Sequence, residues 1–246
     1  MSVQRRPTKL FGTRVVAYLA LSMMMVGCSA ESSLEANEPQ PDLDDAALAS
    51  AVDIRATGCQ GQAIRGAGAV IEGGFVLTAA HVVAGAHSTT VRSATPVTSA
   101  PTTAHIVAID PANDLALLAT TDRSTPSLTL GRASSGDAGI VIVFRRLTAL
   151  AQPFIITRPV NVRIFDIYHR QTVHRDGYQV AIEIEPGDSG GVLIGPKGTA
   201  VGVLYAKSQD ADDRAWATSI SPVAALVARA TLVDPEIGID AGPCAH

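Results

Sequence analysis

After residue 51 the chain consists of short apolar runs separated by glycine, proline and aspartate, and this rhythm limits the fold more than any other feature. The runs recur at intervals of about ten residues; residues 67–71 and 75–80, for example, flank the pair Gly73-Gly74. Runs of this length between turn-forming residues are typical of β-strands. Further strands are expected at residues 89–92, 104–109, 115–119, 139–144, 160–164, 179–184, 192–194, 200–205 and 216–220. Many short strands without intervening helices favour an all-β sandwich or a pair of barrels over an α/β sheet.

One segment near the C-terminus carries a helix signal. Ser221-Pro222 precedes the apolar run 223–230. Serine can cap a helix, and proline suits the first helical position because it lacks the N–H that would be unpaired there. The sequence therefore predicts a short C-terminal helix on an otherwise all-β domain.

The first 27 residues are typical of an export signal. They hold four basic residues and no acid, and the apolar run 15–26 follows the basic head. The next segment, Met25-Val26-Gly27-Cys28, resembles the lipobox of bacterial lipoproteins, in which the cysteine is lipidated and becomes the new N-terminus, although Met25 stands where leucine is usual. An ordinary signal peptide and an uncleaved helical anchor are the alternatives. We expect an exported protein, held at the cell membrane or in the periplasm by lipid on Cys28, with secretion as the alternative.

Residues 28–51 reverse the charge, with six acids and no base. Such a segment buries too little apolar surface to order itself, so we expect a disordered acidic tether with at most a helical turn or two at residues 44–51. The remaining domain, 52–246, is close to neutral, with 15 basic and 17 acidic residues. It lacks the basic footprint of a nucleic-acid-binding protein, and no apolar run approaches the roughly 18 residues of a membrane span.

The cysteine count predicts a covalent link within the domain. If Cys28 carries lipid, Cys59 and Cys244 remain, and in an oxidising compartment such a pair is expected to form a disulfide that closes the domain end to end. Two free thiols are the alternative. A metal site is not expected, because the chain has no CxxC or HExxH motif and no close Cys/His cluster.

Three short segments hold the residue types of nucleophilic catalysis. They are Thr78-Ala79-Ala80-His81, Asn113-Asp114-Leu115 and Gly187-Asp188-Ser189-Gly190-Gly191. The pentad is the most specific of the three, since three glycines with Asp and Ser in a fixed order arise by chance with a probability of about 10⁻³ or below in a chain of this length. His81, Asp114 and Ser189 follow one another at separations of 33 and 75 residues.

On these motifs, the chain from residue 52 to its end resembles trypsin-like serine proteases of the chymotrypsin fold. It is also similar to the protease domain of the actinobacterial acid-resistance periplasmic serine proteases, on the segments Asp166-Ile167-Tyr168, Thr172-Val173 and Gly187-Asp188-Ser189 with flanking Cys59 and Gly242-Pro243-Cys244. Those proteases have several membrane helices ahead of the domain, whereas this chain has a lipobox-like signal, so their acid-stress role is not carried over. The resemblance implies two packed antiparallel β-barrels with a short C-terminal helix, and protein or peptide substrates without a cofactor.

Peptide hydrolysis assigns a role to each residue of the motifs. Ser189 needs a base to accept its proton, and His81 is the candidate. Asp114 would hold the imidazole in the correct tautomer, with Asp110 as the alternative third member. The backbone N–H groups of Gly187 and Ser189 would stabilise the oxyanion.

The aspartate of the pentad bears on activation. In activated trypsin-like zymogens, the acid matching Asp188 pairs with a newly freed N-terminus, but this chain has no Ile-Val-Gly-Gly sequence. We therefore expect an enzyme assembled without that cleavage, in which Asp188 is paired locally or solvated.

Substrate recognition is expected along Leu204-Tyr205-Ala206, where the resembled fold adds the substrate as an extra strand. Glu183 and Glu185 either form an acidic pocket floor that selects Lys or Arg, or alternate outward while Ile182 and Ile184 face the core. A catalytically silent binding module, or an esterase or transacylase on the same site, is the alternative function. The sequence carries no signal for an oligomeric state.

Overall fold

The computed structural model describes residues 41–96, 99–122 and 124–245, so the predicted export signal, Cys28 and the first part of the predicted tether lie outside the described residues. Residues 41–50 of that tether differ from the sequence prediction, which allowed only a helical turn or two at residues 44–51. They form helix α1 (Pro41–Ser50), which contacts strands of both barrels described below. Leu43, Ala47 and Leu48 pack against the core, and this apolar face is what orders a segment that its acids alone would keep in solvent.

The first six strands form an antiparallel sheet that closes on itself. Its order is β1-β2-β3-β6-β5-β4, and the pairing of Val52 with Ser93 joins β1 to β4. The strands are β1 (Ala51–Thr57), β2 (Ala63–Ile71), β3 (Phe75–Thr78), β4 (Ser88–Ser93), β5 (Thr102–Asp110) and β6 (Leu115–Thr120). A 3₁₀ turn, η1 (Cys59–Gly61), joins β1 to β2, and the short helix α2 (Ala80–Val83) follows β3.

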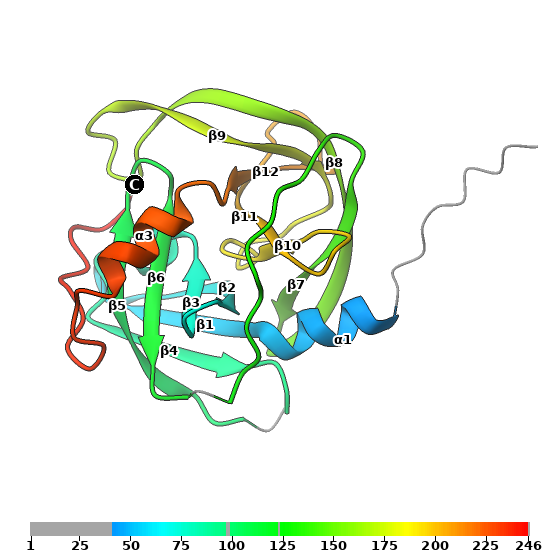
Figure 1. The fold of residues 1–246 in the computed structure, drawn as a ribbon. Helices are drawn as coiled ribbons and strands as arrows, with labels where there is room; N and C mark the ends of the chain where they lie inside the picture. Colours follow the sequence, from blue (N-terminus) through cyan, green and yellow to red (C-terminus); the bar gives the residue numbers. More distant parts are fainter. Residues whose placement is uncertain (1–40, 97–98, 123, 246) are drawn as a thin grey trace, which may run out of the picture. The chain divides into compact units, whose positions relative to one another are not determined.

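The other six strands form a second closed barrel, in the order β7-β8-β9-β12-β11-β10. The pairing of Val141 with Leu193 joins β7 to β10. The strands are β7 (Ala138–Arg145), β8 (Thr148–Phe165), β9 (Thr172–Ala181), β10 (Val192–Ile194), β11 (Ala200–Lys207) and β12 (Arg214–Ser219). Helix α3 (Val223–Ala230) follows β12 and packs on β5 and β6 (Figure 1). Two antiparallel barrels with a short C-terminal helix confirm the predicted fold class.

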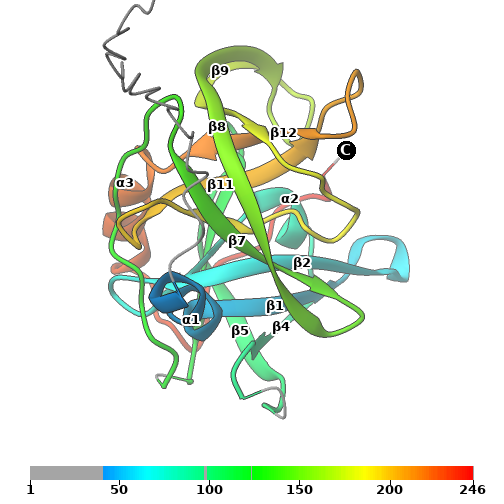
Figure 2. The ribbon, with the colours of Figure 1, turned by 90° about the vertical axis from the view of Figure 1, so that its right-hand side faces the viewer.

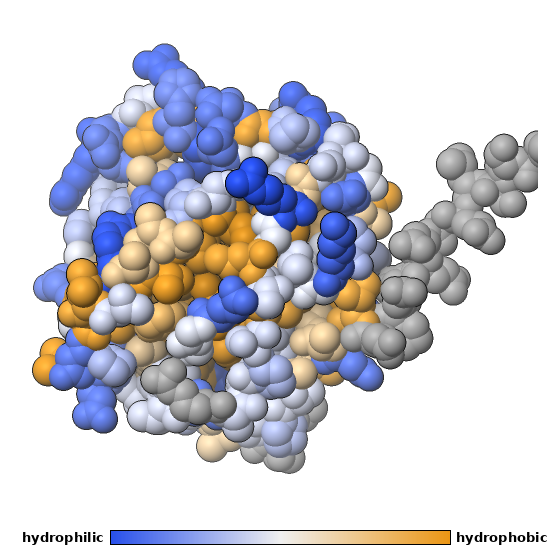
Figure 3. Space-filling view, viewed as in Figure 1, coloured by the Kyte–Doolittle hydropathy of each residue, from blue (hydrophilic) through white to orange (hydrophobic). Residues whose placement is uncertain are grey.

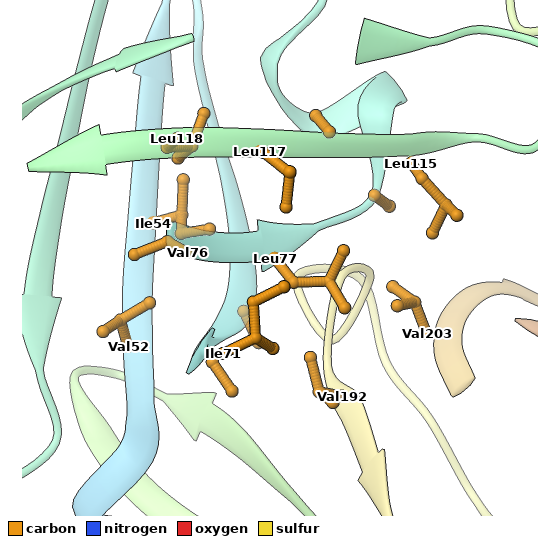
Figure 4. Close-up of a cluster of buried hydrophobic side chains, with 14 of the residues drawn as sticks. Val52, Ile54, Ile71, Val76, Leu77, Leu115, Leu117, Leu118, Val192 and Val203 are labelled. Atoms are coloured by element: carbon orange, nitrogen blue, oxygen red, sulfur yellow. The ribbon is translucent and has the colours of Figure 1, made fainter. Parts of the chain in front are cut away.

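The core explains why the apolar runs of the sequence became strands. Leu115, Leu117 and Leu118 of β6 are fully buried against Val76 and Leu77 of β3 (Figure 4). Val192 and Val203 of the second barrel belong to the same buried cluster, so apolar packing is continuous between the barrels. Burial of a side chain of this size contributes about 1.5–3 kcal/mol.

Each predicted strand overlaps an observed one, but the hairpin β8–β9 differs in length. The sequence predicts residues 160–164 and 179–184, whereas β8 spans 18 residues and β9 ends at Ala181. Most side chains of β8 are exposed or half-buried, because the hairpin continues beyond the barrel to the pair Phe165–Thr172. A strand without a buried face leaves no apolar run in the sequence, which is why its length was missed.

Helix α3 has the predicted bounds but not the predicted cap. Its N-cap residue is Pro222, and no side chain caps the helix. The Ser221 hydroxyl instead lies 2.8 Å from the Ser219 hydroxyl.

The predicted disulfide between Cys59 and Cys244 is present, with a Cα–Cα distance of 5.7 Å. Gly85 lies against it in the left-handed region at φ +71°, where an added Cβ would come within 2.6 Å of Cys59 Sγ and 2.8 Å of the Cys244 backbone nitrogen. The close approach therefore requires glycine at this position.

The segment after α3 runs along the first barrel. Two of its large apolar side chains are exposed, 87% for Leu232 and 75% for Ile237, and Figure 3 shows apolar groups on this face of the molecule. Main-chain hydrogen bonds attach the segment instead, from Ile239 N–H to the Ile106 carbonyl (2.7 Å) and from Gly85 N–H to the Ala241 carbonyl (3.0 Å). Backbone hydrogen bonds and the disulfide, rather than burial of its largest side chains, hold this segment in place.

Candidate active site

His81 and Asp114 come together because β3 and β6 are neighbours. Thr78 at the end of β3 pairs with Ala116 near the start of β6. His81 lies in α2 directly after β3, and Asp114 directly precedes β6. The Ala80 N–H also donates to the Asp114 carbonyl at 3.2 Å, which joins the two loops.

The Asp114 carboxylate contacts His81 through both oxygens. Oδ2 lies 2.8 Å from His81 Nδ1, and Oδ1 accepts from the His81 backbone N–H at 2.9 Å. Asp114 is buried, with 3% of its surface exposed, and adopts φ 56°, a left-handed conformation that aspartate tolerates better than most residues. A carboxylate at Nδ1 favours a proton on that nitrogen and leaves Nε2 as the basic one.

The environment of the imidazole raises its basicity. Burial lowers the pKa of His81, but the charge of Asp114 and its hydrogen bond raise it, and the net pKa is above the ordinary value despite the opposing charge of Arg175.

The alternative acid, Asp110, has a different task. Its Oδ1 accepts from the backbone N–H groups of Ala112 and Asn113, both at 3.1 Å, and its Oδ2 accepts from Asn113 Nδ2 at 2.8 Å. Asp110 therefore closes the turn that presents Asp114, and only Asp114 of the two contacts His81.

Ser189 is held by the first barrel although it precedes a strand of the second. The Ala67 N–H of β2 donates to the Ser189 carbonyl at 2.8 Å. Gly190 follows at φ +86°, and a Cβ there would meet the Ala67 carbonyl oxygen and Thr78 Oγ1. Glycine is therefore required after Ser189 for the loop to pass this close to β2 and β3.

Ser189 and His81 line one open cavity of about 430 Å³, together with Gly187 and residues 63–65 of β2. Within the described part of the chain, no hydrogen bond joins the Ser189 hydroxyl to His81. Such contacts are often long in a substrate-free site and tighten when substrate binds.

The backbone around Ser189 leaves two donors free. Gly187 adopts φ +103°, with nothing near the position of a Cβ. Among the described residues, neither its N–H nor that of Ser189 donates to a main-chain acceptor. Unpaired N–H groups beside a nucleophile can bind a developing oxyanion.

Asp188 is fully buried and paired locally. Its carboxylate bonds the Arg145 guanidinium and accepts from the Glu185 N–H at 2.7 Å. Arg145 also pairs with the exposed carboxylate of Glu185, with Nε 3.1 Å from Oε2. The sequence predicted that Asp188 is paired locally or solvated, but it did not identify Arg145 as the partner. Arg145 lies 43 residues earlier in the chain, at the end of β7, so no local pattern connects the two residues.

Arg175 of β9 is a second residue that the sequence reasoning missed. It is 2% exposed, and its Nη1 lies 3.8 Å from Asp114 Oδ2. Its Nε donates to the Ala112 carbonyl at 3.0 Å, and its guanidinium carbon lies 4.7 Å from the centre of the Tyr205 ring. One buried cation thus contacts the loop of Asp114 and the predicted substrate strand, and nothing in the local sequence marks it.

The predicted substrate strand divides into two parts. Leu204 is fully buried; its N–H donates to the Gly191 carbonyl (2.9 Å) and its carbonyl accepts from the Gly190 N–H (2.8 Å). Both main-chain groups of Leu204 therefore bond the nucleophile loop, and the addition of substrate beside Leu204-Tyr205-Ala206 stays a prediction. The ladder with β12 shifts register between Leu204 and Ala206, and Tyr205 and Ala206 are half-buried.

Glu183 and Glu185 are both exposed, whereas Ile182 and Ile184 are buried in the core of the second barrel. The two glutamates therefore alternate outward, as one of the two predicted arrangements has it, and do not form the floor of a buried pocket. Residues 182–185 follow the end of β9 and are not part of the strand.

The described residues contain no group of three or more His, Cys, Asp or Glu placed to hold a metal ion. In the same residues, no helix is long and apolar enough to cross a membrane.

This fold and site agree with comparisons to known proteins. The trypsin-like peptidase domain matches residues 66–203, and the chain belongs to that family. The serine protease Rv3671c of Mycobacterium tuberculosis is 31% identical over 201 residues, which cover 79% of this chain and 49% of the relative. The magnetosome formation protease MamE of Magnetospirillum gryphiswaldense is 34% identical over 144 residues, 56% of this chain and 18% of the relative. The chain thus spans about half the length of the first relative and less of the second.

Solved structures give the same fold. The active form of the Rv3671c protease from M. tuberculosis superposes with a TM-score of 0.75 at 29% identity, covering 85% of this chain and 93% of that one. The HtrA-type protease AlgW, solved with a tripeptide, has a TM-score of 0.65 at 24% identity, covers 78% of this chain and 62% of that one, and shares the fold. The predicted family is therefore confirmed.

Proposed function

We propose that the protein is an exported serine endopeptidase that cleaves proteins or peptides through an acyl-enzyme. The observation that carries this proposal is the doubly bonded His81–Asp114 pair, of which His81 lines an open cavity together with Ser189 and Gly187. Family membership and relatives named as serine proteases support the reaction class.

In the proposed reaction, Ser189 Oγ attacks the scissile carbonyl carbon while its proton passes to His81 Nε2. The carbonyl oxygen becomes an oxyanion that accepts hydrogen bonds from the Gly187 and Ser189 N–H groups. The C–N bond then breaks, and His81 gives its proton to the leaving amine. Water, deprotonated by His81, attacks the acyl-enzyme, and Ser189 recovers its proton as the acid leaves. Asp114 stabilises the imidazolium throughout.

Export and lipid attachment at Cys28 belong to the same proposal. They are supported by the basic head, the apolar run and the lipobox-like segment of the sequence. A relative named as a probable periplasmic serine endoprotease in Chlamydia trachomatis, 32% identical over 151 residues, supports export. Diacylation would hold the domain on a membrane surface, since each buried CH₂ contributes about 0.8 kcal/mol.

The catalytic proposal is tested with a fluorophosphonate probe and with casein digestion. Wild type should be labelled and should digest casein, and Ser189→Ala should lose labelling and about 10⁶ in turnover. The matched control is Ser127→Ala, because Ser127 is exposed and lies outside the active-site cavity. An unlabelled wild type, or a Ser189→Ala variant that keeps its turnover, would reject the assignment.

The anchor is tested by growing cells with an alkyne fatty acid. Wild type should take up the label and sediment with membranes, and Cys28→Ser should do neither. Equal labelling of the two would exclude Cys28 as the lipid site.

A further inference from the structure

A second cavity continues the active-site cavity along the barrel interface. It has a volume of about 500 Å³ and shares Arg65, Pro186 and Gly187 with the cavity that holds His81 and Ser189. Its far wall consists of residues from the β7–β8 hairpin, which contacts β1 and β2 and crosses them in Figure 2. Gly187 is a proposed oxyanion donor, so the second cavity begins at the scissile bond.

This second cavity lies on the leaving-group side of the site. The part of the substrate before the scissile bond is expected along Tyr205 and Ala206 of β11, and neither cavity is lined by a residue of β11. The part of an extended substrate that follows the scissile bond runs from Ser189 in the direction away from β11. It therefore enters the cavity lined by His81 and Val82 first, and the second cavity next. At about 3.3 Å per residue, the second and third residues after the scissile bond, P2′ and P3′, reach the second cavity.

The charges around the second cavity leave one cation in excess. Asp53 is shared by two arginines, with Oδ1 3.0 Å from Arg65 Nη2 and Oδ2 3.3 Å from Arg92 Nη2. Arg145 is occupied by Asp188 and Glu185. Arg146 is exposed and, within the described residues, has no carboxylate within ion-pair distance. This cluster therefore holds four guanidinium groups and only three carboxylates, although the net charge of the chain is −4. The carboxylates are those of Asp53, Glu185 and Asp188.

The position of Arg146 is set by the hairpin. Arg146 and Leu147 form its turn at φ 49° and 76°, and the Leu147 carbonyl accepts from Arg92 Nη2 at 3.2 Å. This bond attaches the tip of the hairpin to the first barrel beside the Asp53 cluster. Arg146 is thereby held at the rim of the second cavity as a cation open to a ligand.

We propose that this second cavity selects substrates with aspartate or glutamate at P2′ or P3′, and that Arg146 and Arg65 bind the carboxylate. The inference rests on the proposed endopeptidase function and names its substrate class. The arginine fork matches a carboxylate with two hydrogen bonds, and the partly enclosed cavity screens the pair less than an open surface would.

The test uses peptides that differ only in Glu, Gln or Lys at P2′, and a second set that differs at P3′. Wild type should cleave a Glu peptide with a kcat/KM about fivefold above that of its Gln analogue, the scale of a partly exposed ion pair. Arg146→Gln should reduce this ratio to near one, and Arg146→Glu should reverse it in favour of Lys. The matched control, Arg229→Gln, removes one exposed arginine on α3 and should leave the ratio unchanged.

Binding to Ser189→Ala, measured by fluorescence anisotropy with the same peptides, separates this inference from the proposed function. Preferred binding of Glu over Gln that disappears with Arg146→Gln supports the inference whether or not wild type cleaves. Cleavage by wild type with equal kcat/KM for Glu and Gln at both positions overturns it and leaves the endopeptidase function intact. A Glu preference that survives both Arg146→Gln and Arg65→Gln also overturns it.

Discussion

The pair of Arg145 and Asp188 provides a sharp test of how this active site is held in place. Asp188 is 0% exposed, and its side chain is bonded to the Arg145 guanidinium and to the Glu185 N–H. Arg145→Gln removes the only described charge that compensates this carboxylate. Breaking a buried ion pair on one side costs about 3–5 kcal/mol, since the remaining charge stays desolvated.

The structure narrows the loss in free energy of unfolding that is expected for Arg145→Gln. The loss of the Arg145–Glu185 contact adds little, about 0–1 kcal/mol, because the Glu185 side chain is 67% exposed. The hydrogen bond from the Glu185 N–H to the Asp188 carboxylate remains in the variant. The expected loss of stability therefore lies near the lower end of the range, at about 3–4 kcal/mol. With a urea slope of about 2–3 kcal/mol per M, the midpoint of unfolding should fall by about 1–2 M.

The same substitution should also disturb catalysis, since Asp188 lies between the two proposed oxyanion donors. Displacement of one donor costs about 10²–10³ in kcat. Urea unfolding followed by fluorescence, and steady-state cleavage of a peptide, measure the two effects. Arg229→Gln is the control and should stay within about 0.5 kcal/mol of wild type.

A double-mutant cycle decides whether the buried charge is the cause. Asp188→Asn in the Arg145→Gln background removes the uncompensated carboxylate, so the double variant should be more stable than the sum of the single losses predicts. A loss of less than about 1 kcal/mol for Arg145→Gln with kcat unchanged, or two losses that simply add, would contradict this role of the buried charge.

Three further predictions follow from the site and the disulfide. Asp114→Asn should lower kcat by about 10⁴ through the wrong imidazole tautomer, whereas Asp110→Asn, measured beside it, should have a much smaller effect. Burial lowers the pKa of His81, but Asp114 raises it by more, so kcat/KM should fall with decreasing pH through a value above 6.5. The charge of Arg175 lowers this pKa, so Arg175→Gln should move the acid limb of the pH profile to higher pH. An acid limb below 6.5 in wild type would contradict this prediction. Reduction of Cys59–Cys244, which are separated by 185 residues, should lower the free energy of unfolding by at most about 5 kcal/mol, and two titratable thiols in the unreduced, denatured protein would show that the bridge is absent.

Much of the fold was predictable because its signals are local. Turn residues between short apolar runs indicated the strands, and Pro222 before an apolar run indicated α3. The exceptions are β1 and the β8–β9 hairpin. Strand β1 was not predicted, although most of its side chains are buried. Strands β8 and β9 pair over a hairpin in which β8 is mostly exposed, so their length leaves little hydrophobic pattern. Only a helical turn or two was expected at residues 44–51, because the three acids of α1 equal in number the three apolar residues, Leu43, Ala47 and Leu48, that pack on the core.

The sequence by itself determined the strand pattern, the order of His81, Asp114 and Ser189, and the pair of cysteines available for a bridge. Each depends on residue type and on spacing along the chain. Only the tertiary structure placed Asp114 rather than Asp110 against His81, assigned Arg145 to Asp188, placed Arg175 against Asp114, and left Arg146 without an ion-pair partner among the described residues. These contacts join residues up to 61 positions apart across two closed barrels. The energy of an ion pair depends on the distance between its charges and on their burial, and neither quantity exists until the barrels have closed.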